Sequence, residues 1–235
     1  MRRCLSFTVA ALALAATSNS ATADPAKSAA FGRTFMRGFT RCAVRLGRDH
    51  VKKYVLATGN DTLTKDELAG VFVRPCIEAE GPGAHLEMKG LQLKGMFAES
   101  LIARDHGSWP PLNPAELRPI DWSVPEPKLV DPRSGKPLEP AVIKLVQALH
   151  ELAVAQSKVG QLGECVVRAS PAGAVTVLNT KMDDPAELSA LKALTPVIAS
   201  CIKAGEIASF NRTDLRSAIA LSYYRLANAD AQAAR

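Results

Sequence analysis

The sequence has few aromatic residues, no closely spaced cysteines and no long uninterrupted hydrophobic run. Aromatic residues make up 5% of its 235 residues, and two of them are tryptophans, which argues against a β-sandwich with an aromatic core. Its 47% hydrophobic and 22% charged content is that of a globular protein and excludes a disordered or collagen-like chain. The abundance of Ala and Leu favours helices packed through small aliphatic contacts, so the predicted fold class is all-α.

The common signatures of catalytic and metal sites are also missing. No G-x-S-x-G, H-E-x-x-H, glycine-rich phosphate loop or EF-hand pattern occurs. The four histidines are scattered, and no two cysteines are closer than 34 residues, whereas zinc and redox sites use C-x-x-C spacing. The sequence therefore predicts no catalytic residue, no metal site and no cofactor, and it favours a binding protein over an enzyme.

Residues 1–23 have the order of a secretory signal peptide. Arg2 and Arg3 come first, an uncharged apolar run occupies residues 5–17, and residues 21–23 read Ala-Thr-Ala, which fits an A-x-A cleavage site. The run has 13 residues, whereas a helix needs roughly 20 to cross a membrane. We therefore expect an exported protein, periplasmic or secreted, with no transmembrane segment after cleavage.

Export gives the remaining cysteines a structural interpretation. Four stay in the mature chain, namely Cys42, Cys76, Cys165 and Cys201. An even number of cysteines in an oxidising compartment predicts disulfides. Four cysteines allow three connectivities, and the short separations within the first pair and within the second pair favour Cys42 with Cys76 and Cys165 with Cys201.

The segments around these two cysteine pairs resemble each other. Cys42-Ala-Val-Arg is similar to Cys165-Val-Val-Arg, and Cys76-Ile-Glu-Ala is similar to Cys201-Ile-Lys-Ala. Each match alone is weak because these residue types are common. Several matches in one order at nearly equal spacing indicate an internal duplication, and the alternative is two unrelated helical halves of similar composition.

This repetition predicts two tandem helical lobes, each closed by its own disulfide. Lobe 1 would span residues 24–105 and lobe 2 residues 140–235. Residues 93–100 of the first also align with residues 215–222 of the second. The step between the copies is longer than the repeat period of solenoid proteins, so two lobes are expected rather than a stacked array.

Residues 106–139 would form a proline-rich connector between the lobes. Nine of the fifteen prolines lie in residues 106–140, and each removes a backbone donor and restricts the preceding residue, so no long helix or strand is expected there. Both tryptophans, Trp109 and Trp122, also lie there. Because exposed tryptophans are uncommon outside interfaces, we expect the connector to pack against a lobe; the alternative is a mobile linker.

Hydrophobic periodicity predicts the individual helices. The clearest begins the mature chain, with an apolar face made of Phe31, Phe35, Phe39, Cys42 and Leu46. Further helices are expected at residues 51–57, 65–79, 86–104, 140–156, 174–178, 184–203 and 213–228. A strand is the alternative for residues 174–178, because their β-branched residues also suit one. The helix at 140–156 carries Val142, Leu145, Val146, Leu149 and Leu152 on one face. Asp184 and Thr213 are the expected caps of the last two helices.

Arginines line the opposite face of the first predicted helix, at Arg33, Arg37, Arg41 and Arg45. Residues 24–75 hold ten basic and five acidic residues, so the positive charge of the chain is concentrated there. Arginines at four-residue spacing repel one another, and we interpret the stripe as a candidate binding surface for an anionic partner. The alternative is a solvated face, or one neutralised by carboxylates of the same protein.

These features favour an exported, non-enzymatic binding or scaffold protein of the cell envelope that acts through helical surfaces. The mature formal charge of +4 is too small an excess to indicate nucleic acid, so the predicted partner is an anionic envelope surface or another exported protein. Two alternatives remain open. One is a hydrolase or other enzyme with its site between the lobes, and the other is a helical inhibitor or chaperone of another exported protein.

Overall fold

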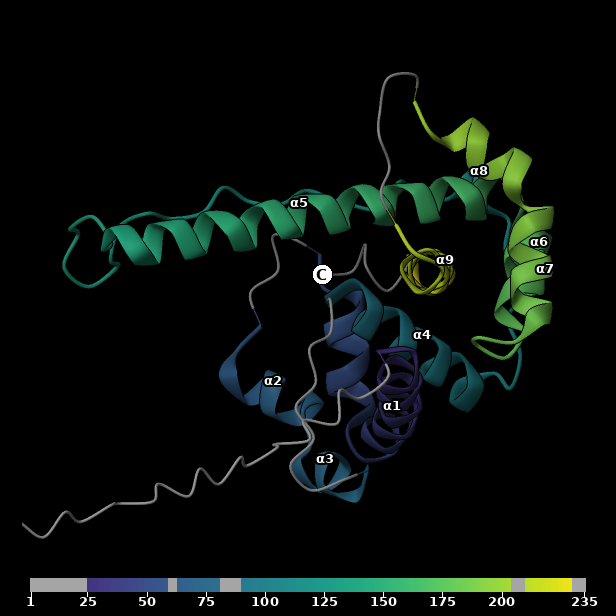
Figure 1. Cartoon of the computed structure of the whole chain (residues 1–235), viewed down its shortest axis with the longest axis horizontal. Coiled ribbons are helices and arrows are strands. Elements are labelled where there is room, and N and C mark those ends of the chain that lie inside the picture. The colour runs from purple at the N-terminus through teal and green to yellow at the C-terminus, as the bar shows by residue number, and fades with distance from the viewer. Residues whose placement is uncertain (1–24, 59–62, 81–89, 204–209, 230–235) are drawn as a thin grey trace, which may run out of the picture.

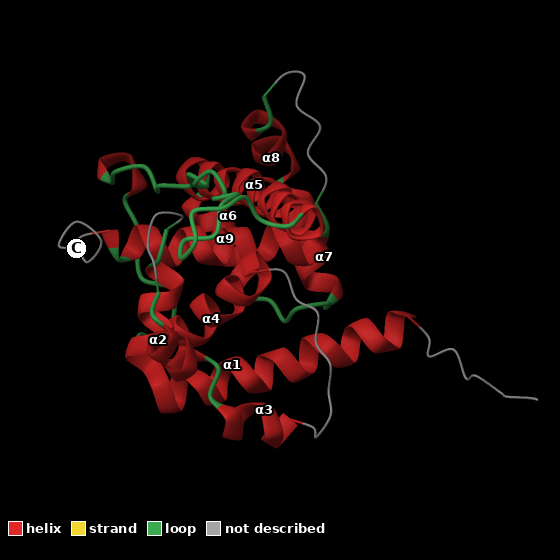
Figure 2. Cartoon of the chain, turned by 90° about the vertical axis from the view of Figure 1, so that its left-hand side faces the viewer, coloured by secondary structure: helices red, strands yellow, loops and turns green. Residues whose placement is uncertain are grey.

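Helices make up most of the chain (Figure 1). The computed structural model describes residues 25–58, 63–80, 90–203 and 210–229, and the predicted signal peptide, residues 1–23, lies outside them. The described helices are α1 (Pro25–Leu56), α2 (Lys65–Val71), α3 (Arg74–Glu80), α4 (Gly90–Asp105), a 3-10 turn (Pro114–Glu116), α5 (Pro140–Ala169), α6 (Pro171–Leu178), α7 (Pro185–Ala193), α8 (Thr195–Cys201) and α9 (Arg212–Ala227). Figure 2 shows helices and loops but no strand in these ranges, which confirms the all-α class.

The core is built around α9. Thirteen consecutive residues of this helix, from Asp214 to Leu226, are buried, so α9 is covered on all sides. It packs against α4, α5 and α6, and Figure 1 shows it end-on beneath α5 and close to α4. Buried side chains of α1, α4, α5, α6 and α7 join those of α9 in one hydrophobic cluster. Helices from both predicted lobes therefore contribute to a shared core.

Two glycines let α9 lie very close to its neighbours. A Cβ atom on Gly95 of α4 would lie 2.5 Å from the Cα of Ser217, and one on Gly163 of α5 would lie 2.5 Å from the main-chain carbon of Ala218. Real side chains do not approach a backbone so closely. Glycine is therefore the residue that fits at each crossing.

Both predicted disulfides are formed. Cys42 on α1 bonds to Cys76 on α3, with 5.5 Å between the Cα atoms, and Cys165 on α5 bonds to Cys201 on α8, with 5.8 Å. Each bond ties a long helix to a short helix of the same half of the chain. The connectivity predicted from the spacing is confirmed.

The buried face of α1 is turned by about a quarter turn from the predicted face. Phe35 and Phe39 are buried as expected, but Phe31 and Leu46 are 62% and 56% exposed. The helix also breaks at Gly47, whose φ of −133° and ψ of 40° are not helical. The predicted face assumed a straight helix covered along its whole length, and the neighbouring helices cover only part of it.

Prolines divide two of the predicted helices. The helix expected at residues 65–79 is two helices, α2 and α3, because Pro75 near the start of α3 has no backbone N–H and restricts the residue before it. Phe72, which follows α2, has a non-helical φ of −91° and ψ of 61°. The helix expected at residues 184–203 is likewise divided into α7 and α8 beside Pro196, where a bend was predicted.

Capping residues set where α7 and α9 begin. Asp184 accepts a hydrogen bond from the backbone N–H of Ala186, which confirms its predicted role. For α9 the cap is Asn211 and not Thr213. Asn211 and Asp214 bond reciprocally in a capping box, so the cap lies two residues before the predicted one.

Helix α5 continues to Ala169, well beyond the predicted end at residue 156. Its first half carries the predicted apolar face, but no described helix covers it. Leu145 and Leu149 are 60% and 56% exposed. None of the described helices, α5 included, is both long and apolar enough to cross a bilayer.

The connector packs onto the helices. The indole Nε1 of Trp122 donates to Glu164 Oε2 at 2.7 Å, and the backbone N–H of Ile120 donates to Glu164 Oε1 at 3.1 Å. Trp109 lies edge-on against Tyr223, with 5.2 Å between the ring centroids. Both tryptophans contact the hydrophobic core, as predicted, so this segment is held against the protein.

Candidate functional site

A cavity of about 410 Å³ lies where the two halves of the chain meet. Its walls come from α1, from α4, from residues 107–109 at the start of the connector, and from residues 178–182, which span the end of α6 and the turn after it. Arg216 of α9 also lines it. This volume is in the range of small-molecule sites, so the cavity is a candidate ligand site.

Arg216 anchors the inner wall and is almost completely buried. Its Nε and Nη2 donate to the two carboxylate oxygens of Glu99 at 2.8 and 2.9 Å, and its Nη1 lies 3.2 Å from Glu187 Oε1. Further hydrogen bonds reach the carbonyl oxygens of Val177, Leu178 and Thr180. Burial acts to lower the pKa of Arg216, but the hydrogen bonds and negative charge of Glu99, with Glu187, raise it above its ordinary value. These contacts occupy the guanidinium, so Arg216 is a structural residue of the wall.

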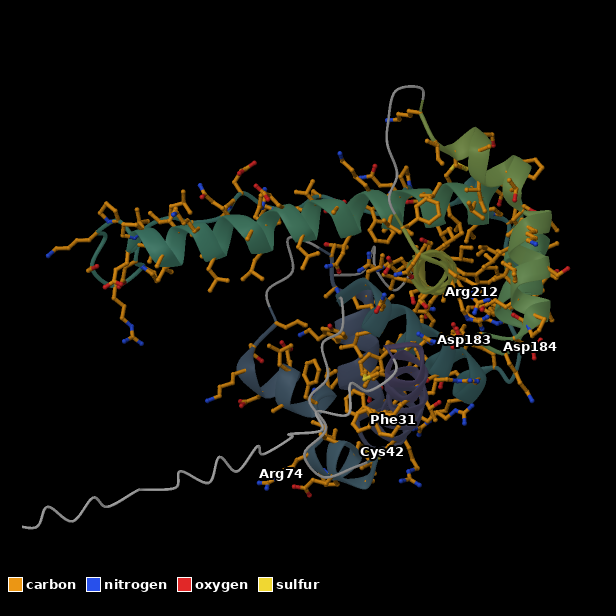
Figure 3. The ribbon with its side chains drawn as sticks, in the orientation of Figure 1. Phe31, Cys42, Arg74, Asp183, Asp184 and Arg212 are labelled. Atoms are coloured by element: carbon orange, nitrogen blue, oxygen red, sulfur yellow. A yellow bond between two sulfur atoms is a disulfide. The ribbon has the colours of Figure 1, made fainter. Side chains whose placement is uncertain are left out.

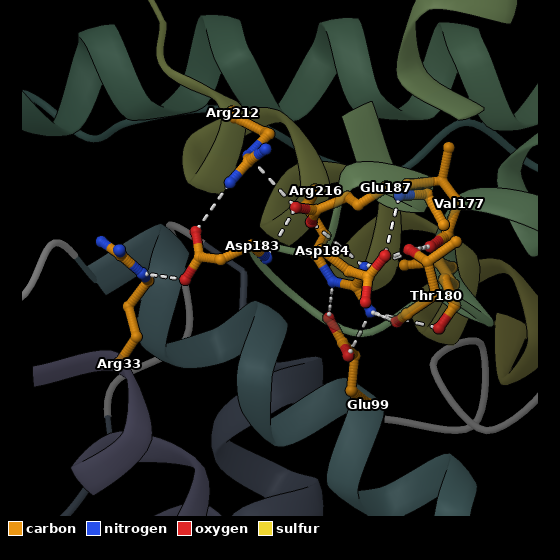
Figure 4. A network of polar contacts seen from close by, with 11 residues as sticks. Arg33, Glu99, Val177, Thr180, Asp183, Asp184, Glu187, Arg212 and Arg216 are labelled. Carbon is orange, nitrogen blue, oxygen red and sulfur yellow. Dashed lines mark hydrogen bonds and ion pairs between the residues drawn. The ribbon is translucent and has the colours of Figure 1, made fainter. Parts of the chain in front are cut away.

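The network of Arg216 extends outward through alternating charges (Figure 4). Glu187 also pairs with Arg212 at 3.1 Å, Arg212 pairs with Asp183 at 2.9 Å, and Asp183 pairs with Arg33 of α1. Burial acts to raise the pKa of Asp183, but the hydrogen bonds from Arg33 and Arg212 outweigh it and lower that pKa. Three arginines thus meet three carboxylates, and this network is neutral as a whole.

Asp183 occupies an unusual backbone position in this network. Its φ of 67° is left-handed, a conformation uncommon for residues other than glycine but tolerated by Asp and Asn. Its backbone N–H donates to Glu187 Oε2 at 2.9 Å, while its side chain points to the two arginines. Figure 3 shows Asp183 near Arg212, on the side of the molecule where α7 begins. The turn therefore fixes a carboxylate between the two halves.

The predicted arginine stripe is divided by the structure. Arg33 is neutralised by Asp183, Arg37 and Arg41 line the cavity, and Arg45 is exposed outside the cavity lining. In the part of the chain that the structure describes, no carboxylate pairs with Arg37 or Arg41. Of the four predicted residues, the cavity brings these two together.

Lys181 adds a third cation to the cavity lining from the turn after α6. It is exposed and, like Arg37, has no acidic partner within the described ranges. Because the charge of Glu99 is met by Arg216, the lining has a formal excess of three positive charges. Such an excess favours an anionic ligand.

Neutral donors and an aromatic ring complete the lining. Ser100 Oγ donates to Thr40 Oγ1 at 3.0 Å, and Thr40 Oγ1 donates to the carbonyl oxygen of Arg37 at 3.3 Å. Ser108 and Trp109 contribute from the connector. The hydroxyl groups of Ser100 and Thr40 thus donate within the protein, and the cavity offers guanidinium and ammonium groups, the hydroxyl of Ser108 and one aromatic wall, which is chemistry that suits a phosphate or carboxylate group.

The cavity offers little for acid–base or metal chemistry. Its one carboxylate, Glu99, is held by Arg216, and its lining contains no histidine. Across the described residues, no three His, Cys, Asp or Glu side chains gather where they could hold a metal ion. Outside the cavity lining, Asp105 directly precedes His106 in the chain, but its carboxylate is held by Arg48 through two hydrogen bonds of 2.8 and 2.9 Å.

Sequence reasoning did not identify Lys181, Arg216 or Glu99 as parts of a site. Arg33 and Asp183 are 150 residues apart, and Arg216 and Glu99 are 117 apart, so no local pattern links them. A charged residue inside an apolar helix was the available signal for Glu99, which interrupts the otherwise uncharged residues 95–103. Arg216 closely follows Arg212 and Asp214, so no such signal marks it.

The site is thus a cationic cavity at the junction of the two halves, with a neutral ion network forming its wall. Arg37, Arg41 and Lys181 are the cations of its lining that have no acidic partner among the described residues. Comparison with known proteins yields no match to a family model, to a curated protein or to a solved structure.

Proposed function

We propose that this chain is an exported, non-enzymatic binding protein that holds an anionic group of its ligand in the cavity between its two halves. The observation that supports this most directly is the pair Arg37 and Arg41, which line the cavity without a carboxylate partner among the described residues. Charges of one sign repel each other at this spacing, and a bound anion would relieve the repulsion. The ligand class is a phosphate or carboxylate group, carried by a small molecule, an envelope component or another exported protein.

Export is part of this proposal. Two disulfides and the lack of a membrane-spanning helix among the described helices are consistent with it. The signal peptide proposed at residues 1–23 supplies the route. N-terminal sequencing of the protein recovered from periplasm or medium tests the route, and a mature N-terminus near Asp24 is the expected result.

The binding experiment compares arginines inside and outside the cavity. Inorganic phosphate and citrate are titrated calorimetrically into the oxidised chain and into Arg37→Gln and Arg41→Gln. Losing one charged hydrogen bond should weaken binding by about tenfold, and added salt should weaken it further. Arg45→Gln is the matched control, because it removes the same charge from the same helix outside the cavity lining.

If Arg37→Gln, Arg41→Gln and Arg45→Gln all bind the anion with equal affinity, the cavity is not the binding site. If neither anion binds the native chain, the same three variants are tested for retention on the envelope fraction of the source cell. Loss of retention in Arg37→Gln and Arg41→Gln, but not in Arg45→Gln, identifies a macromolecular carrier of the anionic group.

We also propose that the two halves are tandem copies. Cys165 lies 123 residues after Cys42, and Ser170, where α5 gives way to α6, lies 123 residues after Gly47, where α1 breaks. Helices α4 and α9 each have 16 residues. A common origin accounts for breaks and lengths that agree in this way.

Two equivalent contacts also support duplication. Lys94 donates to the carbonyl oxygen of Ala57 at 2.9 Å, and Arg216 donates to that of Thr180 at 3.1 Å. Lys94 and Arg216 occupy equivalent positions in α4 and α9, and so do Gly95 and Ser217, which meet where these helices cross. Helices related by a two-fold axis touch at equivalent residues. In a crystal structure of the chain, a rotation of about half a turn should superpose the two halves, and failure to superpose would refute the duplication.

A further inference from the structure

The first half of α5 carries a row of apolar side chains that none of the described residues covers, and we name this row the α5 stripe. It consists of Ala141, Val142, Leu145, Ala148, Leu149, Leu152 and Ala155, and all seven are exposed. Figure 1 shows this half of α5 projecting beyond the other helices. Exposed apolar residues gathered on one helix face mark an interaction surface more often than scattered ones do.

The stripe continues the face through which α5 packs on the core. Leu145 lies 18 residues before Gly163, which is five turns of a helix, so the two share one face. Gly163 packs against α9, whereas Leu145 lies beyond the reach of α9. On its other side, this half of α5 is covered by the connector, since Glu126 lies 3.9 Å from His150 and Ser157 donates to the carbonyl oxygen of Trp122. The described residues therefore leave the apolar stripe uncovered.

The spacing of the stripe is that of a coiled coil. Ala141, Ala148 and Ala155 follow one another at seven-residue intervals, and so do Leu145 and Leu152. A repeat of seven residues keeps one seam of a helix facing a second helix. Alanines in the seam let the two backbones approach closely. The occupant that this pattern fits is therefore another helix with a similar seam.

The charges beside the stripe identify that helix. Lys144 and Glu151 are both exposed, lie on the same edge of the stripe and are themselves seven residues apart. When two copies of α5 pack antiparallel, with Leu145 of one beside Ala148 of the other, Lys144 of each copy lies alongside Glu151 of its partner. In a parallel pair, Lys144 would lie against Leu149 instead. In the antiparallel pair, Lys144 and Glu151 of both copies therefore each have an oppositely charged neighbour.

We propose that the α5 stripe is a homodimer interface in which two copies of α5 pack antiparallel. The contact would extend over residues 141–155, about 22 Å of helix. An isolated coiled coil of this length is marginal, but α5 is already folded and anchored through its second half, so pairing does not have to supply the cost of forming the helix. Antiparallel packing also places the two folded bodies at opposite ends of the contact. This proposal does not depend on what the cavity binds.

Sedimentation equilibrium of the oxidised chain tests the proposal. We expect a monomer–dimer equilibrium at micromolar concentration. Leu145→Asp should raise the dimer dissociation constant by at least about tenfold, because it buries an unpaired charge in the seam. Leu188→Asp is the matched control, since Leu188 is a leucine 43% exposed on α7, outside the stripe, and it should leave the constant unchanged.

A charge exchange tests the antiparallel orientation without touching the seam. Lys144→Glu and Glu151→Lys should each weaken the dimer by at least about threefold, and the double variant should restore the native dissociation constant. Additive weakening in the double variant would overturn the antiparallel arrangement. The interface would be overturned if the native chain stays monomeric at all concentrations, or if Leu145→Asp leaves the dimer dissociation constant unchanged. A monomeric native chain is also the result expected if another segment of the same chain occupies the stripe.

Discussion

Adjacent tyrosines on α9 differ in whether their hydroxyl groups have a hydrogen-bond partner. Tyr223 donates to the carbonyl oxygen of Pro110 at 2.6 Å. The hydroxyl of Tyr224 is buried and finds no hydrogen-bond partner among the described residues. Burial, with the nearby charge of Asp105, raises the pKa of Tyr224, so the group stays neutral at physiological pH.

Removing each hydroxyl should therefore have different effects. Tyr223→Phe should lower the free energy of unfolding by about 1 kcal/mol, because it leaves the carbonyl of Pro110 without this donor. Tyr224→Phe should change it by less than about 0.5 kcal/mol or raise it, because it removes a buried polar group that has no partner. Urea denaturation of both variants measures the difference. Equal losses would contradict the assigned hydrogen bonding.

The ionisation of Glu67 should make the stability of the N-terminal half depend on pH in the acid range. A hydrogen bond from Lys53, followed by one from the backbone N–H of Thr64, lowers the pKa of Glu67 to about 2. A carboxyl group with a lowered pKa in the folded state stabilises that state above its unfolded pKa, about 4.3, and this stabilisation is lost as the pH falls toward 2. At pH 6 the native chain should therefore have a higher melting temperature than the Glu67→Gln variant. The difference between the two melting temperatures should disappear as the pH falls from about 4 to 2. Thermal melts of both proteins across that range check this.

At the scale of the elements, the close crossing of α4 and α9 depends on the glycine at position 95. Gly95→Ala would place a methyl group against the backbone of α9, which cannot move aside as a flexible side chain can. We expect a loss of about 1 to 3 kcal/mol in the free energy of unfolding, despite the better helix propensity of alanine. Gly90→Ala on the same helix is the control, because its nearest neighbour is the end of the Gln156 side chain at 3.4 Å. A neutral Gly95→Ala would show that the helices lie farther apart.

The elements also indicate what the sequence could predict. Asp184, followed by Pro185, starts α7 as expected, because capping is decided by adjacent residues. The apolar face of residues 142–152 was recognised, but a periodic pattern does not reveal whether another element covers it. For the same reason, the sequence did not predict that the buried face of α1 is rotated by about a quarter turn.

The candidate site was predictable only in part. The arginine stripe is a local pattern, and Arg37 and Arg41 do line the cavity. The carboxylate that removes Arg33 from the stripe, Asp183, is 150 residues away, and so the selection among the four arginines depends on tertiary packing. Disulfide pairing was predictable because the four cysteines fall into two short, separate intervals.

At the scale of the whole molecule, the disulfides lie within the halves, while the core is shared between them. Replacing Cys42 and Cys76 by serine should lower stability by about 2 to 4 kcal/mol, since the bond closes a loop of 34 residues. The loss should appear in a single transition of the whole chain, because α9 packs against helices of both halves. Differential scanning calorimetry of this variant and of Cys165→Ser with Cys201→Ser measures it. Two separate transitions would mean that the halves unfold independently.

Arg225 joins a late part of the chain to an early part, so the N-to-C order of synthesis affects how the chain folds. From α9 it donates to the carbonyl oxygens of Val55 and Ala57, where α1 ends, and it also lies 4.9 Å from the ring of Trp122. Arg225 and Val55 are separated by 170 residues, so a growing chain must make all of these before the end of α1 receives this donor. A product released early from the ribosome lacks the central helix and exposes the apolar surfaces that it covers. Proteases should therefore clear incomplete chains and spare finished ones.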